Sequence, residues 1–110
     1  AKNSSIPTLV FDEVDVGIGG ATADIVGRML RLLGHRGQVL CVTHQPQVAA
    51  QAHNHMLVSK NTEKNITYSK IATLSNTETI HEIARMLGGA NITNTTLSHA
   101  KEMIESNKEV

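Results

Sequence analysis

Aromatic residues are almost absent from this sequence, which has one Phe, one Tyr and no Trp among its 110 residues. Any hydrophobic core is therefore aliphatic, a composition that suits packed layers of helices and strands better than a small β-barrel. The length leaves room for one domain. We therefore expect a single α/β domain.

No charge of one sign prevails, since ten Lys and Arg balance ten Asp and Glu. This balance gives no indication that the segment alone binds nucleic acid strongly. No apolar run is long enough to span a membrane, and a signal-peptide pattern is missing, so we expect no membrane contact. The single cysteine, Cys41, lies in an apolar run and predicts a buried, reduced thiol of a cytoplasmic protein.

The most informative stretch covers residues 7–20, where an apolar run stops at two adjacent carboxylates and continues into a glycine-rich loop. Residues 8–12 favour a strand buried on both faces, after a polar and frayed start at residues 1–6. Asp12 and Glu13 then fall at the carboxyl end of that strand, where open α/β sheets place their chemistry.

Ionised carboxylates at the end of a buried strand cost free energy unless a ligand uses them. Hydrated Mg²⁺ is a ligand that fits them, because it is usually held by one or two carboxylates plus water and phosphate. Successive side chains of a strand point to opposite faces, so one carboxylate faces the metal and the other an attacking water. This is the logic of a Walker B element; the alternative is a strand that ends in a polar turn.

The next segments predict a βαβ unit. Apolar residues recur at helical spacing over residues 21–33, and a second buried strand is expected over residues 38–43. Such a succession predicts parallel strands and a right-handed crossover. Pro46 suits the first turn of a short helix over residues 46–52.

His44 follows the second strand and is therefore expected at the same sheet edge as Asp12 and Glu13. A lone histidine is most often a surface or helix-capping residue. Here the convergence with two carboxylates favours a functional role. An imidazole at this place can hydrogen-bond a terminal phosphate and help to orient a water molecule without acting as the main base.

A β-hairpin is expected next, with strands over residues 53–60 and 66–74 and a polar turn over residues 61–65. His53 and His55 would share one face of the first strand and could hold a metal. Nothing nearby completes a ligand set, so exposed histidines are the better interpretation.

Two C-terminal helices are expected to serve as packing elements. Ser75 and Glu78 form a capping-box pattern at the start of the first, which ends near Gly88. The second begins near Thr93, and its apolar residues recur at helical spacing.

Three strings together resemble the RecN family of SMC-like ABC-type ATPases, which acts in bacterial DNA repair. They are Phe-Asp-Glu-Val-Asp-Val-Gly-Ile-Gly-Gly at residues 11–20, Val-Thr-His-Gln-Pro-Gln-Val-Ala at residues 42–49 and Ile-Ala-Arg-Met-Leu-Gly-Gly at residues 83–89. The resemblance covers nearly the whole chain. It implies that residues 1–110 are a C-terminal fragment of one P-loop NTPase head of the ABC/SMC type, carrying the Walker B element, the D-loop and the switch histidine.

The resemblance implies a role for each residue at the sheet edge. Asp12 would be the Walker B aspartate that holds Mg²⁺ through water. Glu13 would be the catalytic carboxylate that orients or deprotonates the attacking water. His44 would be the switch histidine that senses the γ-phosphate.

Residues 14–19 would form the D-loop, which in this family crosses the interface between two heads. Asp15 and Gly17 are accordingly expected to take part in cofactor binding. Gly19 stands where relatives in the wider SMC group place an aspartate, which leaves Asp15 as the nearby carboxylate.

Two motifs of such ATPases are missing from the sequence: the G-x-x-x-x-G-K-[ST] phosphate loop and the Ser-Gly-Gly signature. We expect both upstream in a longer protein, and we expect the chain alone to lack ATPase activity, since phosphoryl transfer depends on positioning all the parts. The resemblance implies ATP and Mg²⁺ as cofactors, a second head as partner in a homodimer, and DNA bound through the full-length protein. It further implies recombinational repair of double-strand breaks in the bacterial cytoplasm, in association with the nucleoid.

Two alternatives stay open. The chain could be a non-catalytic α/β interaction module, or the head fragment of a different SMC-like or ABC ATPase. Transporter subunits usually carry Pro-Thr-Ser after the Asp-Glu pair, and Val14-Asp15-Val16 argues against that class. A head fragment without its phosphate-loop strand is also expected to expose an unpaired strand edge and an apolar helix face, which favours self-association.

Overall fold

The computed structural model describes residues 7–108, so the expected frayed start at residues 1–6 lies outside the described range. The elements follow one another in the order β1 (Leu9–Asp12), α1 (Gly20–Gly34), β2 (Val39–Val42), α2 (Pro46–Ala49), β3 (Met56–Glu63), β4 (Ile66–Thr73), α3 (Asn76–Gly88) and α4 (Asn94–Ser106).

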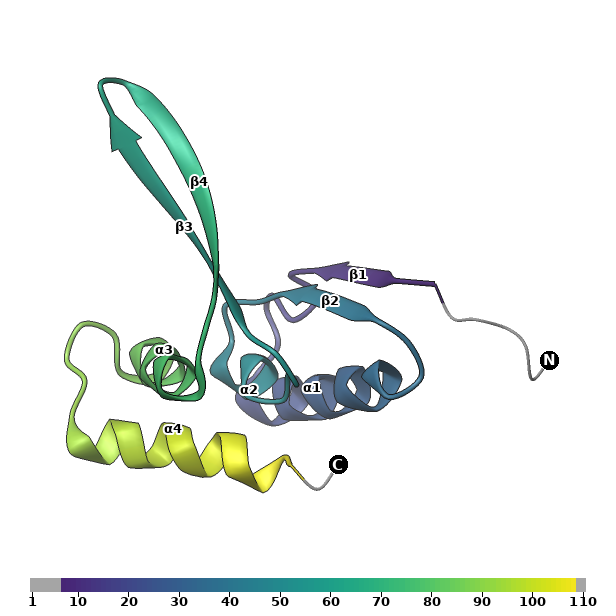
Figure 1. Ribbon diagram of the computed structural model, residues 1–110. Coiled ribbons are helices and arrows are strands. Elements are labelled where there is room, and N and C mark those ends of the chain that lie inside the picture. The colour runs from purple at the N-terminus through teal and green to yellow at the C-terminus, as the bar shows by residue number, and fades with distance from the viewer. Residues whose placement is uncertain (1–6, 109–110) are drawn as a thin grey trace.

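β1 and β2 pair in parallel, with a register that runs from Leu9 beside Val39 to Asp12 beside Val42. α1 connects the two strands and lies along one face of the pair (Figure 1). The predicted βαβ unit is confirmed, and each of its elements begins and ends within one residue of the expected bounds.

The two strands are not buried on both faces, which corrects the expectation from their continuous apolar runs. Val10 is 68% exposed and Val42 is 50% exposed. Leu9 and Phe11, on the opposite face of β1, are half-buried. Cys41 is likewise half-buried rather than fully enclosed. A single layer of helix thus covers this strand pair within the described residues.

Part of the apolar face of α1 packs against no other described residue and is exposed. Ile25, Met29 and Leu32 are 61%, 60% and 51% exposed. Val26 and Leu30, on the same helix, are half-buried. The helix therefore presents an apolar face that no described residue covers, and self-association through that face stays a prediction.

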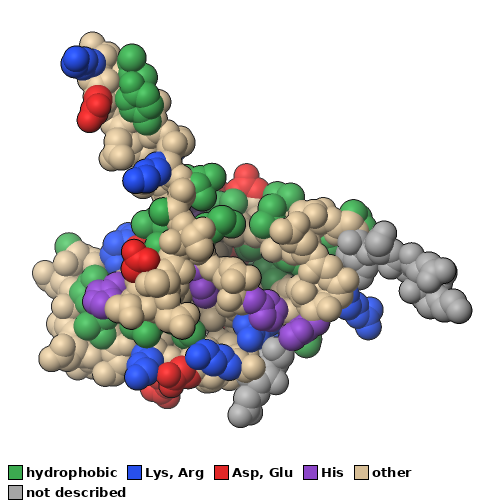
Figure 2. Space-filling view, in the orientation of Figure 1, with side chains coloured by type: hydrophobic (Ala, Val, Ile, Leu, Met, Phe, Trp, Pro, Cys, Tyr) green, Lys and Arg blue, Asp and Glu red, His purple; other side chains and the backbone are tan. Residues whose placement is uncertain are grey.

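β3 and β4 form an antiparallel hairpin that projects from the helices as an arm (Figures 1 and 2). The predicted five-residue turn at 61–65 is wrong, because the strands continue as far as Glu63 and resume at Ile66. Lys64 and Asn65 alone make the turn, with φ of 49° and 66°. Two consecutive left-handed residues match the twist of the strands, which lets the ladder run to the tip.

His53 and His55 precede β3, which begins at Met56, so they do not share a strand face as expected. His55 is half-buried, and its Nε2 lies 2.7 Å from the carbonyl oxygen of Ala49. The His53 ring meets the His35 ring edge-on, with centroids 5.0 Å apart. His53 is exposed as predicted, whereas the same prediction for His55 is wrong. Between residues 7 and 108, no three metal-ligating side chains lie together.

Three alanines and one isoleucine form the centre of the core between α2, α3 and α4. Ala50, Ile83, Ala84 and Ala100 are each at most 2% exposed. Alanine lets helix backbones approach closely, which suits a chain with almost no aromatic volume. The partly buried residues around this centre are aliphatic or methionine, as predicted: Ala49, Ile80, Met86, Leu87, Leu97, Met103 and Ile104.

Both C-terminal helices begin where their caps predict. The Ser75 hydroxyl accepts a hydrogen bond from the Glu78 N–H at 3.2 Å, and the Glu78 carboxylate accepts one from the Ser75 N–H at 2.9 Å. The bond from the Ser75 N–H, and then the Ser75 hydroxyl, lower the pKa of the Glu78 carboxyl. The Thr93 hydroxyl accepts from the Thr96 N–H at 3.2 Å and caps α4. No helix between residues 7 and 108 has the length and apolar character to cross a membrane.

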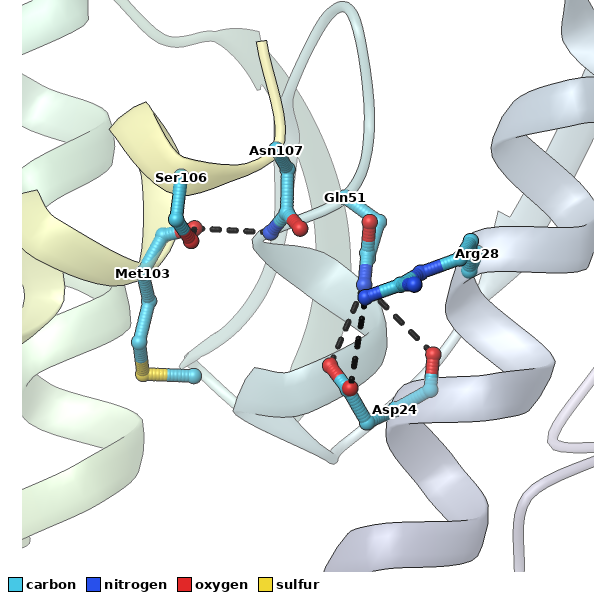
Figure 3. A network of polar contacts seen from close by, with 6 residues as sticks. All are labelled: Asp24, Arg28, Gln51, Met103, Ser106 and Asn107. Carbon is cyan, nitrogen blue, oxygen red and sulfur yellow. Dashed lines mark hydrogen bonds and ion pairs between the residues drawn. The ribbon is translucent and has the colours of Figure 1, made fainter. Parts of the chain in front are cut away.

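α2 ends at Ala49 rather than at the expected residue 52, because its last turn tightens. The N–H of Gln51 donates to the Val48 carbonyl at 3.1 Å, three residues back. Gln51 is 1% exposed and reaches α1, where its Nε2 donates to Asp24 Oδ1 at 3.2 Å (Figure 3). The same junction includes Gly27, at which an added Cβ would lie 2.8 Å from Gln51 Cγ.

We therefore expect Gly27→Ala to lower the free energy of unfolding by about 1–3 kcal/mol, the usual cost of overpacking. The added methyl would also meet the Val48 Cα at 3.1 Å, and backbone cannot move aside cheaply. Gly34→Ala is the matched control on the same helix, because its nearest contact is the His53 Cε1 at 3.4 Å. Urea unfolding followed by circular dichroism makes the comparison. Equal or greater stability of Gly27→Ala than of Gly34→Ala would contradict the packing argument.

Candidate functional site

The carboxyl ends of β1 and β2 meet at one edge of the parallel pair. Asp12 lies beside Val42 in the register, and the N–H of Glu13 donates to the Val42 carbonyl at 2.9 Å, so the pairing extends one residue past β1. Thr43 and His44 leave β2 at the same place. The predicted meeting of the two strand ends is therefore present in the structure.

Glu13 and His44 are in direct contact. His44 Nε2 lies 2.8 Å from Glu13 Oε1, with side chains that are 82% and 44% exposed, respectively. A contact this exposed contributes little stability, and it leaves both side chains where a ligand can reach them. Glu13 has φ of 52°, which is uncommon for a residue with a side chain and is found often at functional sites.

Asp12 is exposed, and its carboxylate makes no hydrogen bond or ion pair with any residue between 7 and 108. The Asp12 charge affects Cys41. Burial is the largest cause that raises the pKa of this thiol, followed by the charge of Asp15 and then that of Asp12. A single unengaged carboxylate fits Mg²⁺ held through water, since this ion keeps several waters and needs few protein ligands. It does not fit a closed metal cage, in agreement with the absence of a larger ligand cluster among the described residues.

Asp15 points inward instead. It is 1% exposed, and the hydroxyl of Thr43 donates a short hydrogen bond to its Oδ2. The side-chain amide of Gln45 donates to the carbonyls of Asp15 and Ile18, at 2.8 and 3.1 Å. Asp15 thus ties the loop after β1 to the end of β2, and its contact with a cofactor remains a prediction.

The loop itself turns at Gly17, whose φ of +81° favours glycine. The N–H of Val16 donates to the Glu13 carbonyl at 3.3 Å, which closes the first turn after the strand. Gly19 then precedes α1, and its carbonyl accepts from the Ala23 N–H at 2.9 Å. A side chain at Gly17 would meet no atom within 4 Å, so the backbone conformation rather than space calls for glycine there.

Sequence reasoning missed Thr43 and Gln45, which fix the loop from the β2 side. The Gln45 N–H also donates to the Thr43 hydroxyl at 3.0 Å, so the two residues form one polar unit on either side of His44. Their signal in the sequence was the string Thr-His-Gln-Pro directly after an apolar run. Short polar residues that flank a candidate site residue at a strand end are the pattern to look for.

Thr43→Val is expected to lower the free energy of unfolding by about 1–3 kcal/mol, because it removes a donor from the buried Asp15 carboxylate without changing the side-chain shape. Thr62→Val is the control, since the Thr62 hydroxyl lies 3.3 Å from that of Thr67 on the exposed hairpin. Urea unfolding of both variants tests this. Equal stabilities would mean that the buried contact does not hold the loop.

The chain was compared with known proteins. No protein-family model matches it. The DNA repair protein RecN of Haemophilus influenzae is 53% identical over 105 residues, which is 96% of this chain and 19% of that protein. RecN of Vibrio cholerae is 49% identical over 94% of the chain, and RecN of Bacillus subtilis is 34% identical over all of it. The chain thus spans about a fifth of the length of these relatives.

A solved structure is similar in fold. It comes from work on the structural biochemistry of ATP-driven dimerization and DNA stimulated activation of SMC ATPases. The match has a TM-score of 0.60 at 17% identity, and it covers 82% of this chain and 53% of the other. The expected α/β fold of an ATPase head, with a parallel strand pair, a hairpin and C-terminal helices, is confirmed. Over nearly its whole length, the chain is similar to one part of these RecN proteins.

Proposed function

We propose that this chain supplies the metal-holding and water-activating part of the ATPase site of a RecN-family DNA repair protein. The observation that carries the proposal is the 2.8 Å contact between Glu13 and His44, at the edge where two parallel strands end. The similarity supports it, since the matched relatives are DNA repair proteins and the similar fold is that of an SMC ATPase.

Each residue at this edge has a proposed role. Asp12 holds Mg²⁺ through water, and the ion, when bound, neutralises charge on the phosphates. Glu13 orients the attacking water and accepts its proton, a task for which an exposed carboxylate at a strand end is suited. His44 keeps the Glu13 side chain at the edge and donates a hydrogen bond to the terminal phosphate.

The loop after β1 is proposed to act as a D-loop between two heads of a homodimer that forms when ATP binds. Asp15, held by Thr43, fixes the base of this loop, and Gly17 gives it the left-handed turn that it needs. The proposed outcome for the longer protein is that hydrolysis releases the heads and changes how the protein holds DNA in recombinational repair of double-strand breaks. We place this activity in the bacterial cytoplasm, in association with the nucleoid.

Glu13→Gln in the longer protein is expected to lower ATP turnover by about 10² to 10⁴, since it removes the base. The variant still binds ATP, so it should accumulate as an ATP-bound dimer. His44→Ala should reduce turnover less, because the carboxylate base remains. Steady-state hydrolysis and sedimentation velocity with ATP measure the two effects.

Glu63→Gln provides the matched control, because Glu63 is an exposed carboxylate at the end of β3 in the hairpin arm. Its turnover should equal that of the wild type. If Glu13→Gln and His44→Ala also hydrolyse ATP normally, the assignment of Asp12 and Glu13 as a Walker B pair is wrong. The edge residues would then be surface groups of a non-catalytic interaction module.

A further inference from the structure

A groove of about 330 Å³ lies on the helical side of the molecule, lined by α1, the segment between α2 and β3, α3 and α4. It shares no residue with the edge cluster of Asp12, Glu13 and His44. Its volume is at the lower end of the range for small-ligand sites. The charged and titratable side chains that line it are Arg31, His53, His55, Lys101, Lys108 and Glu105.

The described residues that line the groove carry more positive than negative charge. Among them, three cations and two imidazoles accompany one carboxylate, whereas the whole sequence has ten basic and ten acidic residues. Figure 2 shows histidine and basic side chains gathered over the helices, below the projecting hairpin. The local excess therefore reflects how the chain folds rather than its composition.

Burial and one groove cation, Arg31, lower the pKa of both imidazoles. Burial first, and then the charge of Arg31, lower the pKa of His53. Burial and Arg31 also lower the pKa of His55, against the opposing effect of its hydrogen bond to the Ala49 carbonyl. A bound anion would act in the opposite direction on both rings, because it favours the protonated imidazole.

The groove walls hold their donors in defined places. Arg31 Nη1 donates to the Gln51 carbonyl at 2.6 Å, which fixes the guanidinium against the segment after α2. His55 Nε2 lies 2.7 Å from the Ala49 carbonyl oxygen, so a protonated ring would have Nδ1 as a further donor. Lys101 and Lys108 are seven residues apart, about two helical turns, and line the opposite wall from α4 and the turn that follows it.

We propose that this groove binds a phosphate group, either in the backbone of a nucleic acid or in a free polyphosphate. A guanidinium, two ammonium groups and two titratable imidazoles around one cavity match the charge and the several acceptor oxygens of phosphate. The site is separate from the proposed ATPase residues and stands whether or not they hydrolyse ATP.

Fluorescence anisotropy with a labelled deoxythymidine oligonucleotide tests the proposal on the 110-residue chain, with circular dichroism to confirm the fold of each variant. Lys101→Ala with Lys108→Ala should weaken binding about tenfold, as two phosphate contacts are lost. Lys60→Ala with Lys64→Ala is the matched control, since it removes the same charge from the hairpin and should change the Kd less than about twofold. Glu105→Gln should strengthen binding, because it removes the carboxylate that faces the groove.

Inorganic pyrophosphate, added at constant ionic strength, separates the two sources of phosphate. Displacement of the oligonucleotide would show that the groove also accepts a free polyphosphate, and binding that pyrophosphate leaves unchanged would show that it takes nucleic-acid backbone alone. Equal weakening by the groove and hairpin double variants would overturn the proposal, because binding would then follow net charge alone. Failure of both probes to bind the wild-type chain would overturn it as well.

Discussion

The parallel pairing of β1 with β2 is the interaction on which the site depends. Parallel strands end at the same edge, so the pairing brings together two segments that are about thirty residues apart in the sequence. The hydrogen bond from the Glu13 N–H to the Val42 carbonyl extends this register just beyond the strand. Glu13 and His44 can meet only because the register is fixed at that point.

A buried polar lock supports the exposed site from behind. Asp15 is enclosed, and buried polar groups require hydrogen bonds. Thr43 donates to its carboxylate and Gln45 to its backbone carbonyl. Both donors come from the segment that carries His44, so the loop after β1 and the end of β2 are fixed as one unit. The three carboxylates at the end of β1 and in the loop after it have different contacts. Asp12 has no partner among the described residues, Glu13 contacts His44, and Asp15 accepts a hydrogen bond from Thr43.

Local patterns predicted much of this fold, and tertiary context decided the rest. The βαβ unit and the capping box of Ser75 and Glu78 follow from periodicity and from side-chain chemistry within a few residues. The predicted length of the hairpin turn was wrong because two-residue turns of this kind usually contain glycine. Here Lys64 and Asn65 adopt the left-handed conformation instead. Which of three neighbouring carboxylates turns inward depends on Thr43, a contact across 28 residues that no local pattern encodes.

A double-mutant cycle on Glu13 and His44 tests the central claim, that the two side chains act as one unit at the strand edge. Single-turnover ATP hydrolysis by the longer protein would be measured for Glu13→Gln, His44→Ala and the combined variant. If the contact positions the carboxylate, the combined variant should lose less activity than the product of the two single losses, because residues that act as a unit lose part of their effect together. A combined loss equal to the product of the two single losses would show that the residues act independently, and would contradict this account.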